Sequence, residues 1–367
     1  MTALYIGIMS GTSLDGIDTV LVDCSTPQCQ LIAHHQTHMP ADIKRHILSI
    51  NQGQATDLPF IGELDYRLGH LFARSVQQLL NKAQVPAEHI CAIGSHGQTV
   101  FHQPDGCTPF TMQLGDANII AVETGIDTVA DFRRKDMALG GQGAPLVPAF
   151  HRAIFPPQSS TQVILNIGGI ANITVLPDDG SIIGYDTGPG NMLMDAWCEY
   201  HIGKPYDEHG EWAQQGQIIT PLLSRLMRDP YLDKAPPKST GREHYHLEWL
   251  THQIGQTDYQ AEDVQRTLCE FTAASIAHHI HRHQQGPTPQ VWVCGGGVHN
   301  PLLMKRLAAL LPEWQVKATD SRGYSSDYME AMAFAWLAKQ RLTHQVSNVP
   351  EVTGARQAAS LGVIYYA

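Results

Sequence analysis

Two segments of the chain share one pattern: an apolar run, a turn of glycines and small polar residues, and a second apolar run. They are ALYIGIMSGTSLDGIDTVLVDC (residues 3–24) and QVILNIGGIANITVL (162–176). Val- and Ile-rich runs joined by such a turn predict β-hairpins. A strand followed by a glycine turn comes later in each half, at ICAIGSHGQ (90–98) and VWVCGGGVHN (291–300). This repetition predicts an internal duplication and an α/β protein of two related domains.

The remaining segments suggest where the domains divide. Apolar residues at helical spacing predict a helix over 62–83, and a loop followed by an apolar helix is predicted over 323–342. The glycine-rich, locally basic stretch 127–148 is expected to connect the halves, and the β-type run at the C-terminus is expected to dock on a core sheet. We therefore expect domain I at 1–130 with 345–367, and domain II at 131–344.

Composition narrows the function classes. Lys plus Arg number 24 and Asp plus Glu number 35, which gives a net charge of −11. This balance disfavours nucleic-acid and anionic-membrane partners, because both attract a positive surface. The seven cysteines have no metal or redox spacing, and the N-terminus lacks a secretory pattern. We expect a cytoplasmic protein that acts on a small molecule.

The two hairpins suggest phosphate binding. Glycine turns can point backbone N–H groups at phosphate oxygens, and Thr12 and Ser13 add hydroxyl donors. Asp15 and Asp18 are candidates to hold Mg²⁺ through water. The plainer alternative is an ordinary Asp-Gly hairpin turn. In CGGGVHN, bare backbone suits an adenine or ribose, whereas the alternative is a close helix–strand contact.

Asp186 is the candidate general base. It lies in SIIGYDTGPGN, where we expect it at the end of a strand and before a helix, although it could instead cap that helix. In DFRRKD, Arg133 and Arg134 are candidates for binding an anion, and the alternative is a solvated charged turn. HHIHRH (278–283) is expected at a helix end, where its spacing disfavours a metal site.

Six motifs taken together resemble the anhydro-N-acetylmuramic acid kinases of bacterial peptidoglycan recycling. They are GIMSGTSLDGID, SHGQTVFH, RRKDMALGGQGAPLVP, NIGGIANIT, YDTGPGN and CGGGVHN, and DYMEAMAFAWLA extends the match. The resemblance implies two duplicated domains of the actin, sugar-kinase and Hsp70 type around a nucleotide cleft. It also implies opening of the 1,6-anhydro bridge by water and phosphorylation of O6, which gives N-acetylmuramate 6-phosphate and ADP.

The resemblance implies a role for each matched residue. Asp186 would be the base. ATP, with Mg²⁺ as its cofactor and no direct protein ligand assigned to the metal, would contact Gly11, Thr12, Ser13, Leu14, Asp15, Gly16, Ile17, Asp18, Gly168, Gly169, Gly295, Gly296, Gly297 and Asn300. The sugar would contact Gln98, Thr99 and Glu330, with Arg133 or Arg134 on its lactyl carboxylate. A homodimer is one open oligomeric state.

Two other functions stay open from the sequence. The first is another sugar or acyl-phosphate kinase of the same fold, which would need a base for an ordinary hydroxyl and no water at the sugar. The second is a non-catalytic, nucleotide-switched binding protein. Asp186 counts against the second, because a switch needs no carboxylate beside the substrate.

Overall fold

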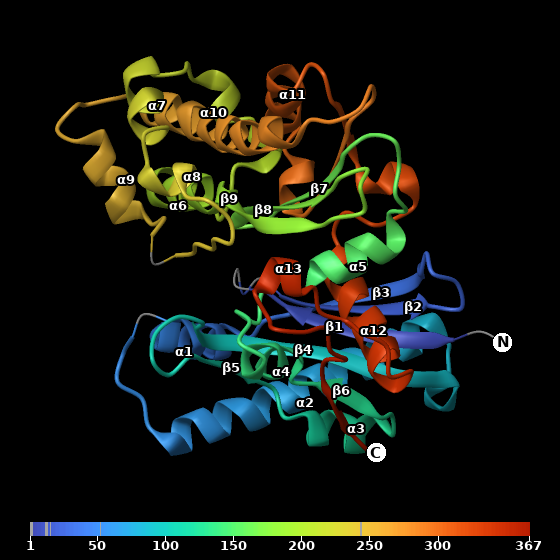
Figure 1. The fold of residues 1–367 in the computed structure, drawn as a ribbon. Helices are drawn as coiled ribbons and strands as arrows, with labels where there is room; N and C mark the ends of the chain where they lie inside the picture. Colours follow the sequence, from blue (N-terminus) through green and yellow to red (C-terminus); the bar gives the residue numbers. More distant parts are fainter. Residues whose placement is uncertain (1–2, 12–13, 15, 52, 243) are drawn as a thin grey trace. The chain divides into compact units, whose positions relative to one another are not determined.

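The structure, a computed structural model of the 367-residue chain, describes residues 3–11, 14, 16–51, 53–242 and 244–367. The chain divides into two compact units (Figure 1). Unit 1 comprises residues 1–156 and 328–367, and unit 2 comprises residues 157–327.

The described residues of unit 1 form seven strands and several helices. The strands are β1 (Leu4–Ser10), β2 (Gly16–Asp23), β3 (Gln30–His38), β4 (Ile90–Gln103), β5 (Phe110–Leu114), β6 (Thr128–Ala130) and β12 (Val363–Tyr365). The α-helices are α1 (Ala41–Asn51), α2 (Leu58–Ala83), α3 (Ala117–Thr124), α4 (Phe132–Ala138), α5 (Val147–Ile154), α12 (Met329–Leu342) and α13 (Pro350–Thr353). The predicted first hairpin, the helix over 62–83 and the docked C-terminal strand are therefore confirmed.

The strands of unit 1 form one sheet in the order β12-β6-β4-β1-β2-β3, with β5 paired to β4. β1 pairs antiparallel with β2 and parallel with β4. Side chains alternate across the sheet, so Ile6 and Ile8 enter the core formed with α2, whereas Gly7 faces α12. The sheet thus has helices on both faces.

The α12 helix lies very close to its sheet. A Cβ on Gly7 would lie 1.9 Å from the backbone oxygen of Ala331, and one on Gly94 would lie 2.0 Å from that of Phe334. The two glycines are neighbours in the β1–β4 register. Only hydrogen at both positions permits this distance, so Gly7 serves helix packing.

Within its described residues, unit 2 contains five strands and six α-helices. The strands are β7 (Gln162–Ile167), β8 (Ile170–Leu176), β9 (Ile183–Pro189), β10 (Gln290–Cys294) and β11 (Gln315–Ala318). The α-helices are α6 (Met192–Ile202), α7 (Thr220–Leu226), α8 (Pro230–Asp233), α9 (Leu247–Ile254), α10 (Ala261–Ile280) and α11 (Pro301–Leu310). The second predicted hairpin, β7–β8, and the helix that ends in the histidine tract are confirmed.

The two sheets share one topology, which confirms the predicted duplication. In unit 2 the order is β11-β10-β7-β8-β9. β7 pairs antiparallel with β8 and parallel with β10, and β8 pairs antiparallel with β9. The path β6-β4-β1-β2-β3 of unit 1 repeats this order strand for strand. Each unit has its own apolar core, and the α/β class is confirmed.

The unit boundaries differ from those expected from the sequence. Segments 131–156 and 328–344 were expected in domain II, whereas they belong to unit 1. The physical reason for the second segment is the contact of α12 with β1 and β4. A local pattern shows that α12 is buried, but it does not show which sheet covers it.

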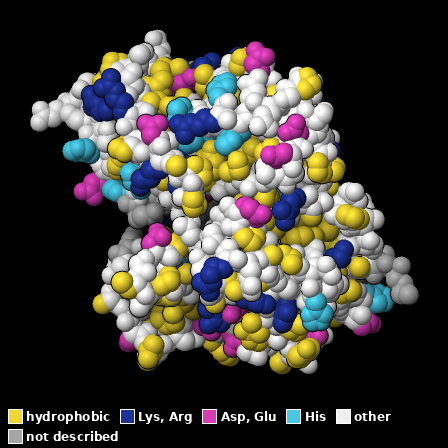
Figure 2. All heavy atoms as spheres, in the orientation of Figure 1, with side chains coloured by type: hydrophobic (Ala, Val, Ile, Leu, Met, Phe, Trp, Pro, Cys, Tyr) yellow, Lys and Arg dark blue, Asp and Glu magenta, His cyan; other side chains and the backbone are white. Residues whose placement is uncertain are grey.

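The distribution of surface charge and the apolar character of the helices are relevant to the partners that the chain could bind. On the visible face of each unit, acidic, basic and histidine side chains are interspersed (Figure 2). Within the described part of the chain, no helix combines the length and apolar character needed to cross a membrane.

Candidate active site

The first hairpin gives its predicted residues different environments. Thr12, Ser13 and Asp15 lie outside the described residues. The side chains of Leu14 and Ile17 are buried in the core of unit 1, so only their backbone is available to a ligand. The remaining predicted residues here are Gly11, Gly16 and Asp18.

Asp18 is the predicted site carboxylate of this hairpin that the structure describes. It lies on β2, is half-buried, and accepts a hydrogen bond from Gln36 Nε2 at 3.1 Å. Asp18 interacts electrostatically with Glu330. Glu330 lies in the first turn of α12, in the segment where a helix was predicted. Burial raises the pKa of Glu330, Asp18 raises it further, and Arg133 opposes both. The three charged groups therefore form one electrostatic cluster.

Arg133 is held by hydrogen bonds to groups on two other segments. Its Nε and one terminal nitrogen donate to His96 Nε2 at 3.1 and 2.7 Å, and the other terminal nitrogen donates to the Gly143 oxygen at 2.8 Å. Burial lowers its pKa to about 10, opposed by Glu330 and Asp136. The residues after Asp131 form helix α4, so the alternative of a solvated charged turn is wrong for Arg133. Arg134 is exposed and pairs with Asp131 at 2.6 Å.

His96 is the member of this group that the sequence did not single out. Burial, reinforced by Arg133, lowers its pKa well below the usual value, so the ring is neutral and accepts from Arg133. Its ring contacts Phe334 at 4.8 Å between centroids. Its position inside SHGQT, beside the predicted sugar residues, was the available signal.

Gln98 and Thr99 lie on β4, which continues to Gln103, so the expected strand end at SHGQT is wrong. Gly97, at φ +75°, lets the strand pass through this irregular stretch. Gln98 is fully buried and its Oε1 accepts from the Ser10 hydroxyl at 2.6 Å. Thr99 is half-buried and accepts from Gln113 Nε2 at 3.2 Å.

The second hairpin caps a helix with its carbonyl groups. The oxygen of Gly168 accepts from the Asn191 N–H at 2.8 Å, and the oxygen of Gly169 accepts from Gly190 and Met192 at 2.9 and 3.1 Å. A Cβ on Gly169 would meet nothing closer than 3.7 Å, and one on Gly168 nothing closer than 3.6 Å. The fold therefore does not require glycine at either position for lack of space.

Asp186 lies in the middle of β9, not at its end as predicted. The strand continues through Gly188 and Pro189 because an irregularity in the β8–β9 register leaves Thr187 as an extra residue. In the sheet register, Asp186 on β9 lies opposite Asn172 on β8, and Asn172 lies opposite Asn166 on β7. Directly opposed residues share a face, so three polar side chains form a row.

This polar row lies opposite the core face. Leu165, Ile173 and Tyr185, next to the three polar residues, point into the core that contains α10. Asp186 is fixed by hydrogen bonds as well. Its Oδ2 accepts from the Thr240 N–H at 3.0 Å, its N–H donates to the Lys238 oxygen at 3.3 Å, and its oxygen accepts from the Tyr231 hydroxyl at 2.9 Å. The expected capping alternative receives no support from these partners.

The three glycines of CGGGVHN have different surroundings. Gly295 has φ +81°, and a Cβ there would lie 2.3 Å from Asn166 Oδ1. A Cβ on Gly297 would lie 2.4 Å from Ile167 Cγ2, whereas one on Gly296 would meet only Asn191 Nδ2 at 3.8 Å. Gly295 and Gly297 thus make the close packing contact, and Gly296 is open. Asn300 caps α11 through its Oδ1, which accepts from Leu303 N at 3.1 Å.

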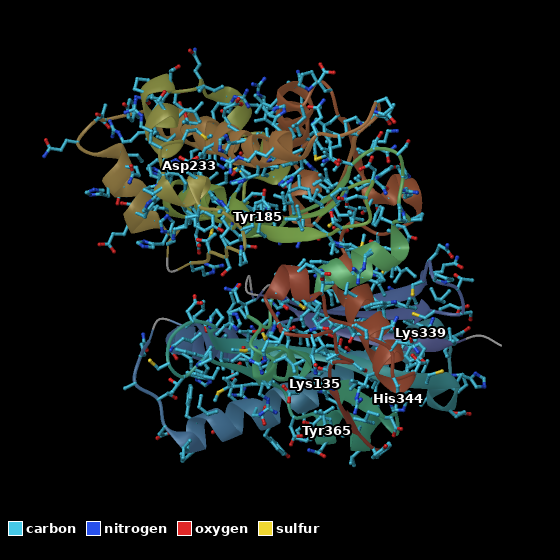
Figure 3. All side chains as sticks on the ribbon, viewed as in Figure 1. Lys135, Tyr185, Asp233, Lys339, His344 and Tyr365 are labelled. Atoms are coloured by element: carbon cyan, nitrogen blue, oxygen red, sulfur yellow. The ribbon has the colours of Figure 1, made fainter. Side chains whose placement is uncertain are left out.

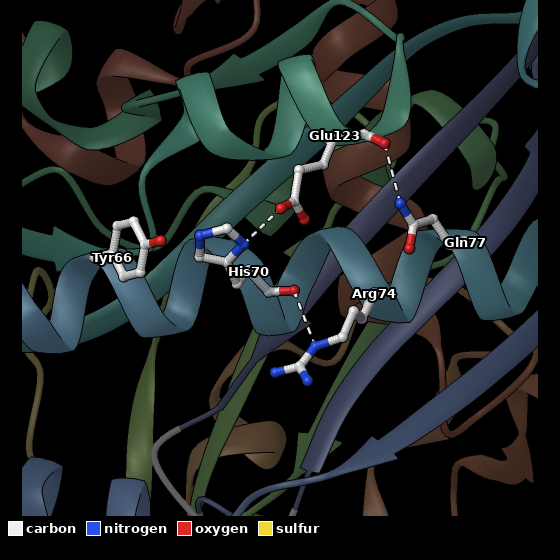
Figure 4. A pocket seen from close by; sticks show the side chains of 5 residues that line it. All are labelled: Tyr66, His70, Arg74, Gln77 and Glu123. Atoms are coloured by element: carbon white, nitrogen blue, oxygen red, sulfur yellow. Dashed lines mark hydrogen bonds and ion pairs between the residues drawn. The ribbon is translucent and has the colours of Figure 1, made fainter.

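A separate surface hollow lies on α2 and α3 (Figure 4). It is lined by Tyr66, His70, Arg74, Gln77 and Glu123, with His70 Nδ1 paired to Glu123 at 2.6 Å. None of the residues predicted to bind nucleotide or sugar belongs to it. The candidate functional groups therefore lie elsewhere in each unit: the first hairpin and the residues around Arg133 in unit 1, and the second hairpin and the polar row in unit 2.

The chain consists of two α/β units of the same topology, each opening with a glycine hairpin, and its full-length family match identifies the class as a kinase. Residues 3–367 match the family of anhydro-N-acetylmuramic acid kinases. The chain belongs to this family.

Similar proteins with that name cover nearly the whole chain. The one from Vibrio parahaemolyticus is 62% identical over 362 residues, and the one from Vibrio vulnificus strain YJ016 is 61% identical, each covering 99% of this chain and 98% of the relative. The Pasteurella multocida protein is 53% identical and covers 99% and 97%.

Among solved structures, the activator of the 2-hydroxyisocaproyl-CoA dehydratase from Clostridium difficile aligns with a TM-score of 0.46 and 12% identity, covering 94% of this chain and 96% of that one. A glucokinase of the ROK family from Streptomyces griseus aligns with a TM-score of 0.40 and 13% identity, covering 92% and 100%.

Proposed function

We propose that the chain opens the 1,6-anhydro bridge of 1,6-anhydro-N-acetylmuramic acid and phosphorylates O6 with ATP, in the cytoplasmic recycling of peptidoglycan. The observation that carries this proposal is the full-length match to relatives named for that kinase activity, at up to 62% identity. The fixed position of Asp186 supports it at the level of chemistry, because a base must be held still beside its proton.

The reaction needs one base and one stabilised phosphoryl group. Water adds to the anomeric carbon and gives its proton to Asp186. The bond from that carbon to O6 breaks as the new carbon–oxygen bond forms. O6 then attacks the γ-phosphorus of ATP, and the bond to the β–γ bridging oxygen breaks to release ADP. One carboxylate thus serves both steps, since O6 leaves in the first and attacks in the second.

We assign the nucleotide to backbone that the fold leaves open. Gly168, Gly169 and Gly296 have room that packing does not need. Backbone N–H groups there would stabilise charge on the phosphates. The other nucleotide residues predicted from the sequence remain in this assignment, with Asn300 acting through the helix that it caps.

Mg²⁺ fits the residues of the first hairpin. Among the described residues, no group of three or more His, Cys, Asp or Glu is placed to hold a metal, and Asp18 is a single half-buried carboxylate. This donor set suits an ion that keeps its water and binds phosphate oxygens. Asp18 would hold the ion through water. The ion would neutralise charge on the transferring phosphoryl group.

We assign the lactyl carboxylate of the sugar to Arg133 in preference to Arg134. Arg133 is positioned by His96 and Gly143, whereas Arg134 is exposed and engaged by Asp131. A positioned guanidinium binds a carboxylate with little loss of side-chain freedom. Thr99 and Glu330 complete the sugar contacts, and Gln98, which is buried against Ser10, supports the strand of Thr99.

Replacing Asp186 tests the proposal. Asp186→Asn keeps the shape and the Thr240 contact but cannot accept a proton, so we expect kcat to fall by about a hundredfold or more with little change in binding. The assay supplies ATP, Mg²⁺, the anhydro sugar and ¹⁸O-labelled water, and mass spectrometry follows both bond changes. Asp258→Asn, an exposed carboxylate before α10, is the matched control. Near-native turnover of Asp186→Asn, or phosphorylation without incorporation of label, would refute the coupled mechanism.

A further inference from the structure

Lys238 is a buried cation in an otherwise exposed stretch. Residues 233–237 and 239 are exposed, whereas Lys238 is only 8% exposed. Its Nζ donates to the oxygens of Tyr231 and Leu232 at 2.9 and 3.3 Å and lies 3.3 Å from His279 Nε2. An ammonium has three N–H donors, and these three partners match them. Lys238 therefore anchors the loop by directional bonds.

The histidine tract supplies one side of this anchor. His279 is fully buried on α10, and burial together with the Lys238 charge lowers its pKa to about 3. A neutral imidazole nitrogen can accept a hydrogen bond from the Lys238 ammonium. His283 Nε2 lies 2.8 Å from the Tyr185 hydroxyl, and the His279 and Tyr185 rings meet edge to face. The tract thus packs against Tyr185 of β9, which is labelled in Figure 3.

The anchored loop wraps the edge of β9 at Asp186. Lys238 Nζ lies on the core side, 5.7 Å from the Tyr185 ring. The Lys238 oxygen pairs at the strand edge with the Asp186 N–H, and the Thr240 N–H reaches Asp186 Oδ2. Adjacent strand residues face opposite sides, so the loop passes from one face of the sheet to the other within three residues.

From this geometry we infer that Lys238, held by His279, is the positioning residue that orients the carboxylate of Asp186. The inference rests on the proposed role of Asp186 as the base. Burying an ammonium costs desolvation free energy that burying an apolar side chain would not. Burial is also the main cause that lowers the pKa of Lys238 to about 8. Fixed placement of a base explains that cost, because misplacement by about an ångström lowers a rate by about a hundredfold.

A double-mutant cycle tests the inference. Lys238→Met removes the donors and keeps the length, and we expect kcat to fall by about tenfold or more while both KM values change by less than about threefold. In the Asp186→Asn background the same change should have no further effect on single-turnover rate, since Lys238 acts through the lost base. Lys234→Met, an exposed lysine of the same loop, is the matched control and should keep native kcat.

The possible outcomes distinguish failure of the inference on Lys238 from failure of the assignment of Asp186 as the base. An active Asp186→Asn overturns the base assignment and the inference with it. An inactive Asp186→Asn beside a native-like Lys238→Met overturns the inference alone. Equal losses from Lys238→Met in both backgrounds indicate a structural role and also overturn it. If Lys238→Met does not fold, His279→Leu removes one of the three acceptors, and its loss of kcat must likewise disappear in the Asp186→Asn background.

Discussion

The glycines among the candidate site residues fall into two groups, those that packing requires and those that it does not. Gly295 and Gly297 have no room for a side chain against Asn166 and Ile167, so the fold itself requires them. Gly169 and Gly296 have room, and neither has a positive φ. A requirement for glycine at these two positions would therefore come from a bound ligand.

This distinction gives a prediction for Gly169→Ala. The melting temperature should stay within about 2 °C of the native value, because the added methyl group meets ordinary contacts. The KM for ATP should rise by about tenfold, since the methyl group would lie where the phosphates approach. Thermal unfolding without ligand and steady-state kinetics measure the two effects. Gly62→Ala, an open glycine on α2, is the control for kinetics. Unchanged ATP dependence would contradict the assignment of the nucleotide to this hairpin.

Among the elements, α12 determines how unit 1 is built. It follows β11 of unit 2 in the chain and yet covers the sheet of unit 1, where β1 and β4 expose glycines to it. The atoms that exclude a side chain at Gly7 and Gly94 are backbone carbonyls, which cannot rotate away. The helix can accommodate a larger residue only by shifting as a whole.

We therefore expect Gly94→Ala to destabilise the protein by about 2 to 3 kcal/mol or more. Urea unfolding followed by circular dichroism gives the free energy. Gly62→Ala provides the comparison, because it adds the same methyl group in open space on a helix and should stabilise by about 0.5 to 1 kcal/mol. Equal stability of Gly94→Ala and the native protein would mean that α12 is not packed as described.

Local pattern predicted elements better than it predicted their ends. The hairpins, α2 and α12 follow from apolar periodicity and turn residues. The sequence TGPG suggested a loop after Asp186, but an edge strand tolerates proline, and the extra residue at Thr187 lets β9 continue. DFRRKD suggested a turn because its charges hide the buried positions Phe132 and Asp136.

Across the whole molecule, the parts of the site missed from the sequence depend on long-range contacts. Thr240 is 54 residues from Asp186, Lys238 is 41 residues from His279, and Arg133 is 37 from His96. No local pattern marks such pairs. Motifs therefore gave the candidate site residues, whereas the groups that hold those residues in place could be found only in the folded chain.

Both units also contain buried neutral histidines, and these predict acid sensitivity. Burial lowers the pKa of His151 in unit 1 and of His279 in unit 2 to about 3. The unfolded chain takes up a proton at each near pH 6.5, whereas the folded chain does not until about pH 3. The free energy of unfolding therefore falls as pH decreases through this window.

The effect can be isolated at His151. Between pH 7 and pH 5 the native protein should lose about 2 kcal/mol more stability than His151→Leu, because the variant no longer has this site to protonate on unfolding. Urea unfolding at the two pH values gives the difference, with His252→Leu, an exposed histidine of α9, as the control. The same loss in native protein and His151→Leu would show that His151 does not govern it.

The packing of α12 on Gly7 and Gly94 also bears on how this family can diverge. A gene copy released from selection for catalysis would still need glycine at both positions to fold, but it would be free to drift at Gly169 and Gly296. We expect a duplicate that has lost its chemistry to keep the first pair and to vary at the second. The four positions together could then separate silent copies from working enzymes in newly sequenced genomes.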